Sequence, residues 1–192
     1  MSTRIHSSSL AGLFVPALVC CAQTPPVADR FLQLFDQLRA AETTHQPVAL
    51  RLTDLEINDY LRYSLQAVPR PGLESLTVKI FPANYISTFT VIDFDAVERW
   101  HPGTIPTLLR PVLNGKKSLW LDYRFQAQDS LLTFSVEKAR FENIPIPAFV
   151  MGEVIKIVGA RQPEKYDTGK PVPIPFGIHR LWTLDHVLEG RN

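Results

Sequence analysis

The chain has 192 residues, of which 45% are hydrophobic and 20% are charged, proportions typical of a folded globular protein with a sizeable core. Its 20 lysine and arginine residues nearly balance 19 aspartate and glutamate residues, which gives a formal net charge of +1. This balance argues against nucleic acid as a partner and against charge-driven binding to an anionic membrane, because both need a basic excess.

The N-terminal residues have the pattern of an export signal. Arg4 precedes the apolar run LAGLFVPALVCCA, and the sequence QTPP follows it. We expect residues 1–22 to be a signal that is cleaved after Ala22, which would place the protein in the periplasm or cell envelope. The alternative, a buried N-terminal helix, has to accommodate Pro16 within the apolar run.

Both cysteines, Cys20 and Cys21, lie in this segment, so a chain cleaved after Ala22 contains no disulfide. A second outcome is open, because Leu-Val-Cys-Cys resembles a distorted lipobox in which Cys21 would be acylated. A small residue normally precedes the acylated cysteine, and Cys20 departs from that pattern. We expect the rest of the chain, residues 27–192, to form a single domain.

Two helices are predicted next along the chain. Apolar residues recur at a spacing of three and four over residues 29–42, which indicates an amphipathic helix. After the linker TTHQP, the capping box Thr53-Asp54-Leu55-Glu56 marks the start of a second helix, with Leu52 and Ile57 as its hydrophobic staple. Pro69 ends it.

From residue 73 the apolar period changes to two, which predicts strands. Residues 73–81 and 85–94 form a hairpin around the turn PAN, and the proline-rich residues 101–117 are expected to be a loop with at most a short helix near 107–113. A second hairpin follows, in which a strand with an apolar row turns at Asp129-Ser130 into a strand over 131–141.

The sequence RFENIPIPAFVMGEVIKIVG then predicts a corner and a helix. Pro145 and Pro147 should end the strand ladder in an extended bend, and residues 148–158 are apolar almost all the way round a helix. Such a helix must be covered on most sides. Near the C-terminus, IHRLWTLDHVL predicts one or two closing strands.

The sequence carries no recognised catalytic motif, phosphate-binding loop or cysteine metal pair, so we predict no catalytic residue, cofactor or metal. The nearest candidate is DFDAVERWH, whose acidic residues and histidine would converge on a cation if the chain turned there: Asp93, Asp95, Glu98 and His101. The favoured interpretation is structural, with Asp95 capping a short turn and the others solvated.

Histidine and tryptophan residues are also interpreted structurally. His179 and His186 have a spacing without metal geometry, so we place them on strand surfaces. Trp100, Trp120 and Trp182 are each expected to fill the core, because aromatic rows at strand spacing usually pack against a helix.

Two segments carry a resemblance to a known group of proteins. LTDLEINDYL resembles the start of YceB-type lipoproteins, and RFENIPIPAFVMGEVI resembles the strand, proline corner and helix of the LmeA-type phospholipid-binding family. The order of predicted elements is similar to that of small tubular lipid-binding (TULIP-like) proteins of bacterial envelopes. The resemblance covers about residues 50–160, and the proline-rich loop at 101–111 departs from it.

The resemblance implies an α+β fold in which a highly curved antiparallel sheet wraps around a long apolar helix, half-TULIP-like, behind an N-terminal helical segment. It implies no catalytic residues, and it implies a hydrophobic groove for an acyl or isoprenoid chain. We expect two strands and the helix to supply the groove residues: Tyr123, Phe125, Phe134, Val150, Met151, Val154 and Ile155.

We therefore expect an exported protein that binds an apolar ligand and contacts a membrane surface. Two alternatives stay open. One is a ligand-free structural or assembly factor of the envelope. The other is an enzyme with a cystatin-like or nuclear-transport-factor-like cone fold, with Asp93, Asp95 and His101 at the mouth of the cone.

Overall fold

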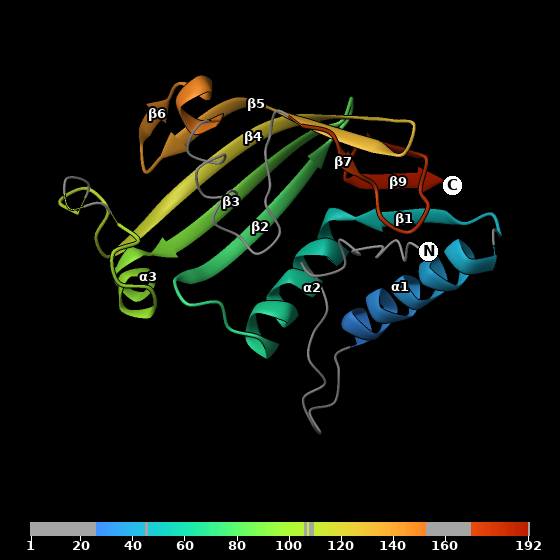
Figure 1. Cartoon of the computed structure of the whole chain (residues 1–192), viewed down its shortest axis with the longest axis horizontal. Helices are drawn as coiled ribbons and strands as arrows, with labels where there is room; N and C mark the ends of the chain where they lie inside the picture. Colours follow the sequence, from blue (N-terminus) through green and yellow to red (C-terminus); the bar gives the residue numbers. More distant parts are fainter. Residues whose placement is uncertain (1–25, 45, 106, 108–109, 153–169, 192) are drawn as a thin grey trace, which may run out of the picture.

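The computed structural model describes residues 26–44, 46–105, 107, 110–152 and 170–191. These residues form an α+β fold with two antiparallel sheets and helices beside them (Figure 1). The elements in chain order are α1 (Pro26–Thr44), β1 (Ala49–Thr53), α2 (Asp54–Ala67), β2 (Leu73–Phe81), β3 (Tyr85–Asp93), α3 (Phe94–Trp100), β4 (Lys116–Gln128), β5 (Leu131–Phe141), β6 (Ile144–Ile146), β7 (Val172–Pro173), β8 (Arg180–Leu184) and β9 (Val187–Arg191).

The two predicted helices are confirmed as α1 and α2. At the start of α2, the hydroxyl of Thr53 accepts a hydrogen bond from the backbone N–H of Glu56 at 3.2 Å. The Glu56 carboxylate accepts one from the backbone N–H of Thr53 at 2.8 Å, which completes the capping box. Between the helices, Phe31 stacks on Tyr60 with ring centroids 4.6 Å apart. Both rings belong to the hydrophobic cluster that joins α1, α2 and β1.

A small sheet has the strand order β1-β9-β8. The predicted closing strands are confirmed as β8 and β9, and β1 is a strand that the sequence analysis did not assign. Leu50 and Leu52 point from β1 into the hydrophobic cluster, while Ala49 and Arg51 are exposed. This alternation is the period of a half-buried strand.

The larger sheet has the order β2-β3-β4-β5-β6, with β7 paired to the other end of β5. Both predicted hairpins are confirmed, as β2–β3 and β4–β5. Their turns need left-handed backbone conformations, which Ala83, Asn84, Asp129 and Ser130 adopt with φ between 52° and 62°. Asparagine and aspartate tolerate this region better than most residues.

The proline corner is a strand, which corrects the extended bend predicted for it. β6 continues the ladder beyond β5, with Pro145 opposite Arg140 and Ile146 opposite Ala139. Proline is tolerated there because β6 is an edge strand, where only one side of the backbone has to pair. Residues 148–152 are helical, and the Pro147 carbonyl accepts the first bonds from Val150 and Met151.

Helix α2 lies along the edge of the sheet and not across its middle strands. The Asn58 side chain donates to the Val78 carbonyl at 2.8 Å and accepts from the Val78 N–H at 2.7 Å. A primary amide thereby satisfies one residue of the open edge of β2, which would otherwise be available to another strand.

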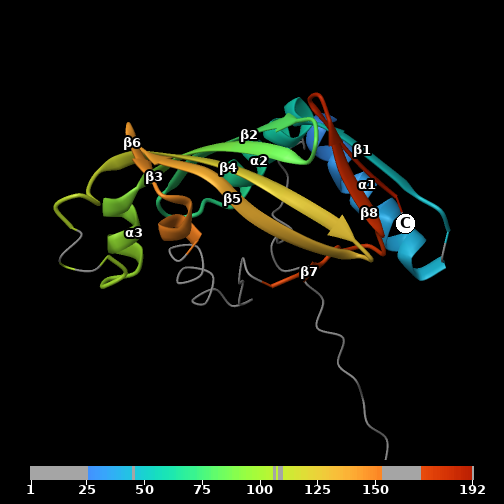
Figure 2. The same ribbon diagram turned by 90° about the horizontal axis from the view of Figure 1, so that it is seen from above.

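The described residues show an open, twisted sheet and no long apolar helix wrapped by it (Figure 2). The helix predicted over residues 148–158 is described only for 148–152, and the rest of that prediction lies outside the described residues. The α+β class is therefore established, whereas the wrapped arrangement stays a prediction.

Candidate apolar binding face

One face of the larger sheet is apolar, and cross-strand pairing fixes which residues share it. Side chains alternate between faces along a strand, and residues directly opposite in the ladder point to the same side. Starting from Tyr123, the register places on one side a set that we call the apolar face: Ile80, Ile86, Leu119, Leu121, Tyr123, Phe125, Phe134, Val136, Ala139, Phe141 and Ile146. The same side carries Thr88 and Thr90 of β3, opposite Leu121 and Leu119.

Burial is uneven over the apolar face. Ile80 and Phe125, 0% and 2% exposed, lie where the sheet meets the β8–β9 hairpin. Leu119, Leu121 and Phe141 lie toward the other end of β4 and β5 and are only half-buried. The first region is core, and the second leaves apolar surface that another apolar group can cover.

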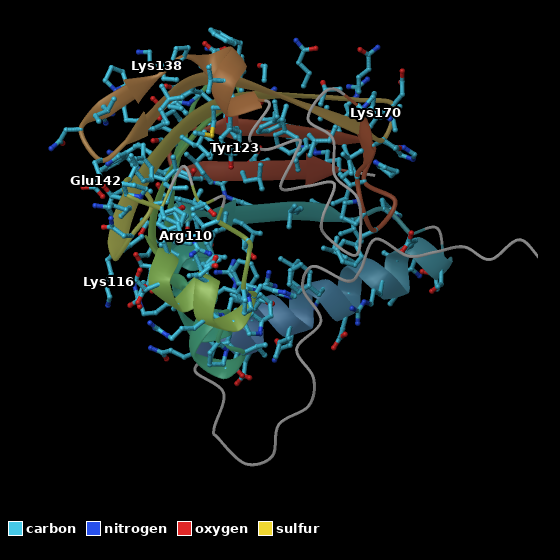
Figure 3. All side chains as sticks on the ribbon, turned by 60° about the vertical axis from the view of Figure 1, so that its left-hand side comes forward. Arg110, Lys116, Tyr123, Lys138, Glu142 and Lys170 are labelled. Atoms are coloured by element: carbon cyan, nitrogen blue, oxygen red, sulfur yellow. The ribbon has the colours of Figure 1, made fainter. Side chains whose placement is uncertain are left out.

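The structure brings the three predicted strand residues together. The rings of Tyr123 and Phe134 meet edge to face with centroids 5.8 Å apart, and Phe125 lies opposite Phe134 in the ladder. In Figure 3, Tyr123 lies near the middle of the view, whereas Lys116 and Lys138 lie at its left margin. These three residues share one location in the structure. Their contact with a ligand stays a prediction.

The predicted helical residues are divided. Met151 is buried at 4% exposure, but Val150 is 39% exposed. In the first helical turn after Pro147, the Met151 side chain is therefore covered and the Val150 side chain is not. Val154 and Ile155 lie outside the described residues. Val150 therefore lies at the surface, and its contact with a ligand stays a prediction.

The opposite face of the sheet carries charged and aromatic side chains. Trp120 contacts Phe89 with ring centroids 4.4 Å apart, and the Arg140 guanidinium lies 5.3 Å from the Trp120 ring centre. An open groove of about 520 Å³ borders Trp120, Lys138, Arg140 and Pro145. This face is mixed in character and offers an apolar chain less continuous contact than the apolar face.

The tryptophans correct the expectation that each fills the core. Trp100 is 61% exposed at the end of α3, and Trp120 is 37% exposed. Trp182 is half-buried and its indole N–H donates to the Glu189 carboxylate at 3.0 Å. Strand spacing alone does not say which of two faces is covered, and Trp120 is on the open one.

In the segment DFDAVERWH, acidic side chains accept hydrogen bonds from nearby backbone N–H groups. Asp93, and not Asp95 as predicted, caps helix α3 by accepting from the Ala96 N–H at 3.0 Å. Glu98 accepts from the N–H groups of Gly103 and Ile105 at 2.8 and 3.0 Å. These bonds, together with the nearby Arg110 guanidinium, lower the pKa of Glu98. Within the part of the chain that the structure describes, no three metal-ligating side chains come together.

The two histidines make specific contacts at turns, which sequence reasoning missed. The His186 ring N–H (Nδ1) donates to the Asp54 carboxylate at 2.7 Å, and this bond raises the pKa of His186. The backbone of His186 also accepts from the Asp54 N–H and donates to the Ile80 carbonyl. His179 bonds to the hydroxyl of Ser130 in the β4–β5 turn. No local motif signals contacts between residues so far apart in the chain.

No family model matches the sequence, and no curated protein matches it either. The resemblance to TULIP-like proteins therefore stays a prediction. Among the described helices, none combines the length and apolar character needed to cross a membrane.

Proposed function

We propose that this is an exported envelope protein that binds an acyl or isoprenoid chain against the apolar face. The observation that carries the proposal is the half-buried part of that face, around Leu119, Leu121 and Phe141. At its end the ring of Phe94, the first residue of α3, lies 6.0 Å from the Phe141 ring. In the half-TULIP-like arrangement, the segment that follows Pro147 would close over this region and form a groove with the sheet.

The energetics favour an apolar ligand over a polar one. Burial of apolar surface contributes about 25 cal/mol per Å², so even half of an acyl chain laid on the sheet gains several kcal/mol. The strands offer leucine and aromatic side chains in a continuous area, and their backbone groups already pair within the sheet. Of the polar groups on this side, the Thr88 hydroxyl donates to the Leu121 carbonyl at 3.3 Å.

Export is the second part of the proposal, and it rests on the charged, apolar and small-residue pattern of residues 1–22. Cleavage after Ala22 gives a periplasmic protein, and acylation of Cys21 gives one that is anchored to a membrane. N-terminal sequencing of protein from the envelope fraction distinguishes these two outcomes. An intact Met1 contradicts export.

Two neighbouring residues of β4 provide a matched test of the binding face. Leu121 lies on the apolar face, whereas Trp120 lies on the opposite face. In Leu121→Gln we expect a folded protein with less co-purified lipid, because an amide in the groove loses its hydration without gaining a partner. Trp120→Gln should keep its lipid. Native mass spectrometry and solvent extraction measure the lipid in both.

Three results would contradict the proposal. Wild-type protein without lipid would favour the ligand-free structural or assembly factor. Unfolding of Leu121→Gln would indicate that this region is closed core, because a buried amide without partners costs several kcal/mol. Equal lipid loss in both variants would place the ligand elsewhere.

A further inference from the structure

One charged side chain lies on the side of the larger sheet that carries the apolar face. Lys117 is opposite Ile92 in the β3–β4 ladder and two residues before Leu119, so its side chain points to the same side as Leu119. Every other side chain that the register of β2 to β6 places on this side is uncharged. Lys117 therefore stands out by its position, at the end of β4 where the half-buried part of the face begins.

This end of the sheet has no marked charge bias as a whole, and its charges lie on different sides. Lys116, the neighbour of Lys117, points to the opposite face and pairs with Glu74 at 3.0 Å. The other acidic side chains, apart from the exposed Asp95, accept bonds from backbone N–H groups: Asp93, Glu98 and Glu142. Among the described residues, no carboxylate forms an ion pair with Lys117.

Apolar side chains flank Lys117. Ile92 and Leu119 are its neighbours on the same side, and Phe141, opposite Leu119, has its ring 6.0 Å from that of Phe94. Lys117 itself is half-buried. A charge beside apolar groups is solvated less well and interacts more strongly with an opposite charge than it would in water. An anionic group is therefore the partner that this position favours.

The hydroxyl of Thr90 is a second donor near Lys117. Thr90 lies opposite Leu119, which makes it a diagonal neighbour of Lys117 across the ladder, at about 7–8 Å. Thr88 donates its hydroxyl to the Leu121 carbonyl at 3.3 Å, whereas within the described residues no hydrogen bond engages the hydroxyl of Thr90. A carboxylate or phosphate group between Lys117 and Thr90 has acceptor oxygens for both.

An apolar path leads away from Lys117 along β4. Leu119, Leu121 and Tyr123 follow at every second residue, and at roughly 3.3 Å per residue the path from Lys117 to Tyr123 is about 20 Å long. Phe125, the next residue on this side, is 2% exposed, so the path ends in the core. The face thus has one charged end and one closed apolar end, which fits a molecule with an anionic headgroup and a long apolar chain.

We propose that the ligand of the apolar face is an anionic amphiphile whose carboxylate or phosphate group is bound by Lys117 and Thr90. This inference rests on the proposed function and adds to it the charge of the ligand and its direction along β4. Charge-assisted hydrogen bonds are about twice as strong as neutral ones, so the headgroup contributes to selection among lipids. Recognition depends on one paired charge and needs no basic excess in the chain.

Three probes with the same chain test the charge of the ligand: oleate, oleyl alcohol and oleylamine. Equilibrium dialysis measures their binding to the purified protein after removal of lipid. We expect oleate to bind roughly tenfold or more tightly than the alcohol, because hydrogen bonds to charged groups are the stronger ones, and the amine to bind most weakly. Equal binding of oleate and the alcohol would overturn this inference and leave the proposed function standing. Failure of all three probes to bind would overturn both.

Substitutions of Lys117 test its role directly. Lys117→Met keeps an unbranched side chain without the charge, so oleate should bind roughly tenfold more weakly while the alcohol binds as before. Lys117→Arg should keep the preference for oleate, and Lys117→Glu should shift it to the amine. Lys116→Met, adjacent but on the opposite face, is the matched control and should behave like wild type. Equal effects of Lys117→Met and Lys116→Met would overturn the proposal.

A threonine pair and a second headgroup refine the test. Thr90→Val should weaken oleate binding severalfold, whereas Thr133→Val, on the opposite face of β5, should not. An unchanged affinity in Thr90→Val would overturn its part in the proposal. Oleoyl lysophosphatidic acid, compared with oleate, distinguishes the two sources of the anionic group. Binding of each should depend on Lys117, and the tighter one identifies phosphate or carboxylate as the preferred headgroup.

Photo-crosslinking tests the direction of the chain, and it needs no variant. A fatty acid with a diazirine at its methyl end should label the protein near Tyr123 and Val136, which are opposite in the β4–β5 ladder. A diazirine beside the carboxylate should label the region of Leu119 and Phe141 instead. Circular dichroism checks the fold of every variant, and if Lys117→Met unfolds, the crosslinking pattern decides. The reverse pattern, or labelling of the opposite face around Trp120, would overturn the proposal.

Discussion

The imidazole of His186 makes stability depend on pH. Its pKa is raised, first by the hydrogen bond to Asp54 and then by the charges of Asp54 and Asp185. A raised folded-state pKa means that the stabilisation is fully present below the unfolded pKa of about 6.5 and is lost as pH rises through the folded pKa. We expect the thermal midpoint to fall from pH 6 to pH 8.5. His186→Gln should flatten this part of the profile, and an unchanged profile would contradict the pairing.

Contacts between single residues differ in whether the sequence can predict them. The capping box of Thr53 and Glu56 was predicted correctly because both partners lie within one turn of chain. The His186–Asp54 bond joins residues 132 positions apart, so no local spacing announces it. Asp93 rather than Asp95 caps α3 because the helix begins one residue after the strand ends, and such boundaries depend on tertiary contacts.

At the scale of elements, local pairing was predictable and distant pairing was not. Both hairpins of the larger sheet join strands that are neighbours in sequence, and turn residues mark them. Among the described strands, β1 pairs only with β9, more than 130 residues away. Strand β6 carries a proline, which normally argues against a strand. Proline is tolerated in β6 because this strand lies at the edge of the sheet.

Gly72 shows how closely two elements approach. It has φ +87°, and a Cβ atom there would lie 2.1 Å from the Val97 Cγ2 atom in α3. Gly103 has nearly the same φ, +84°, with open space around it. We expect Gly103→Ala to cost about 1–2 kcal/mol from the backbone alone. Gly72→Ala should cost about 1–3 kcal/mol more from the clash. Urea denaturation compares the two, and equal costs would contradict the close contact of α3 with this turn.

At the scale of the whole molecule, the pairing of β4 with β5 places Tyr123, Phe125 and Phe134 on one side. Their role as groove residues stays a prediction. The sequence predicted the apolar row of β4 that this side carries. It did not predict the position of α2. The bond between Asn58 and Val78 draws that helix to the edge of the sheet, and a single polar side chain within an amphipathic helix gives no sign of its partner.

One buried hydroxyl joins the two sheets, in addition to the bond from the His186 N–H to the Ile80 carbonyl. Thr183 in β8, 4% exposed, donates from Oγ1 to the Phe81 carbonyl at 2.6 Å and accepts from the Asn84 N–H at 2.7 Å. The Thr183 N–H in turn donates to the Asn84 side chain at 2.9 Å. The β2–β3 turn is thereby locked against the β8–β9 hairpin, and through it against β1 and the helices.

Replacement of this hydroxyl should loosen the two sheets from each other. Thr183→Val keeps the shape but leaves the Asn84 N–H and the Phe81 carbonyl short of a partner, so we expect a loss of about 2–3 kcal/mol. Thr88→Val is the control, since its hydroxyl reaches the Leu121 carbonyl only at 3.3 Å and should change stability by less than about 1 kcal/mol. Hydrogen exchange by mass spectrometry locates the effect. Faster exchange in β1, β8 and β9 with β3 and β4 still protected would identify Thr183 as the joint, whereas uniform acceleration would mean that both sheets open as a single cooperative unit.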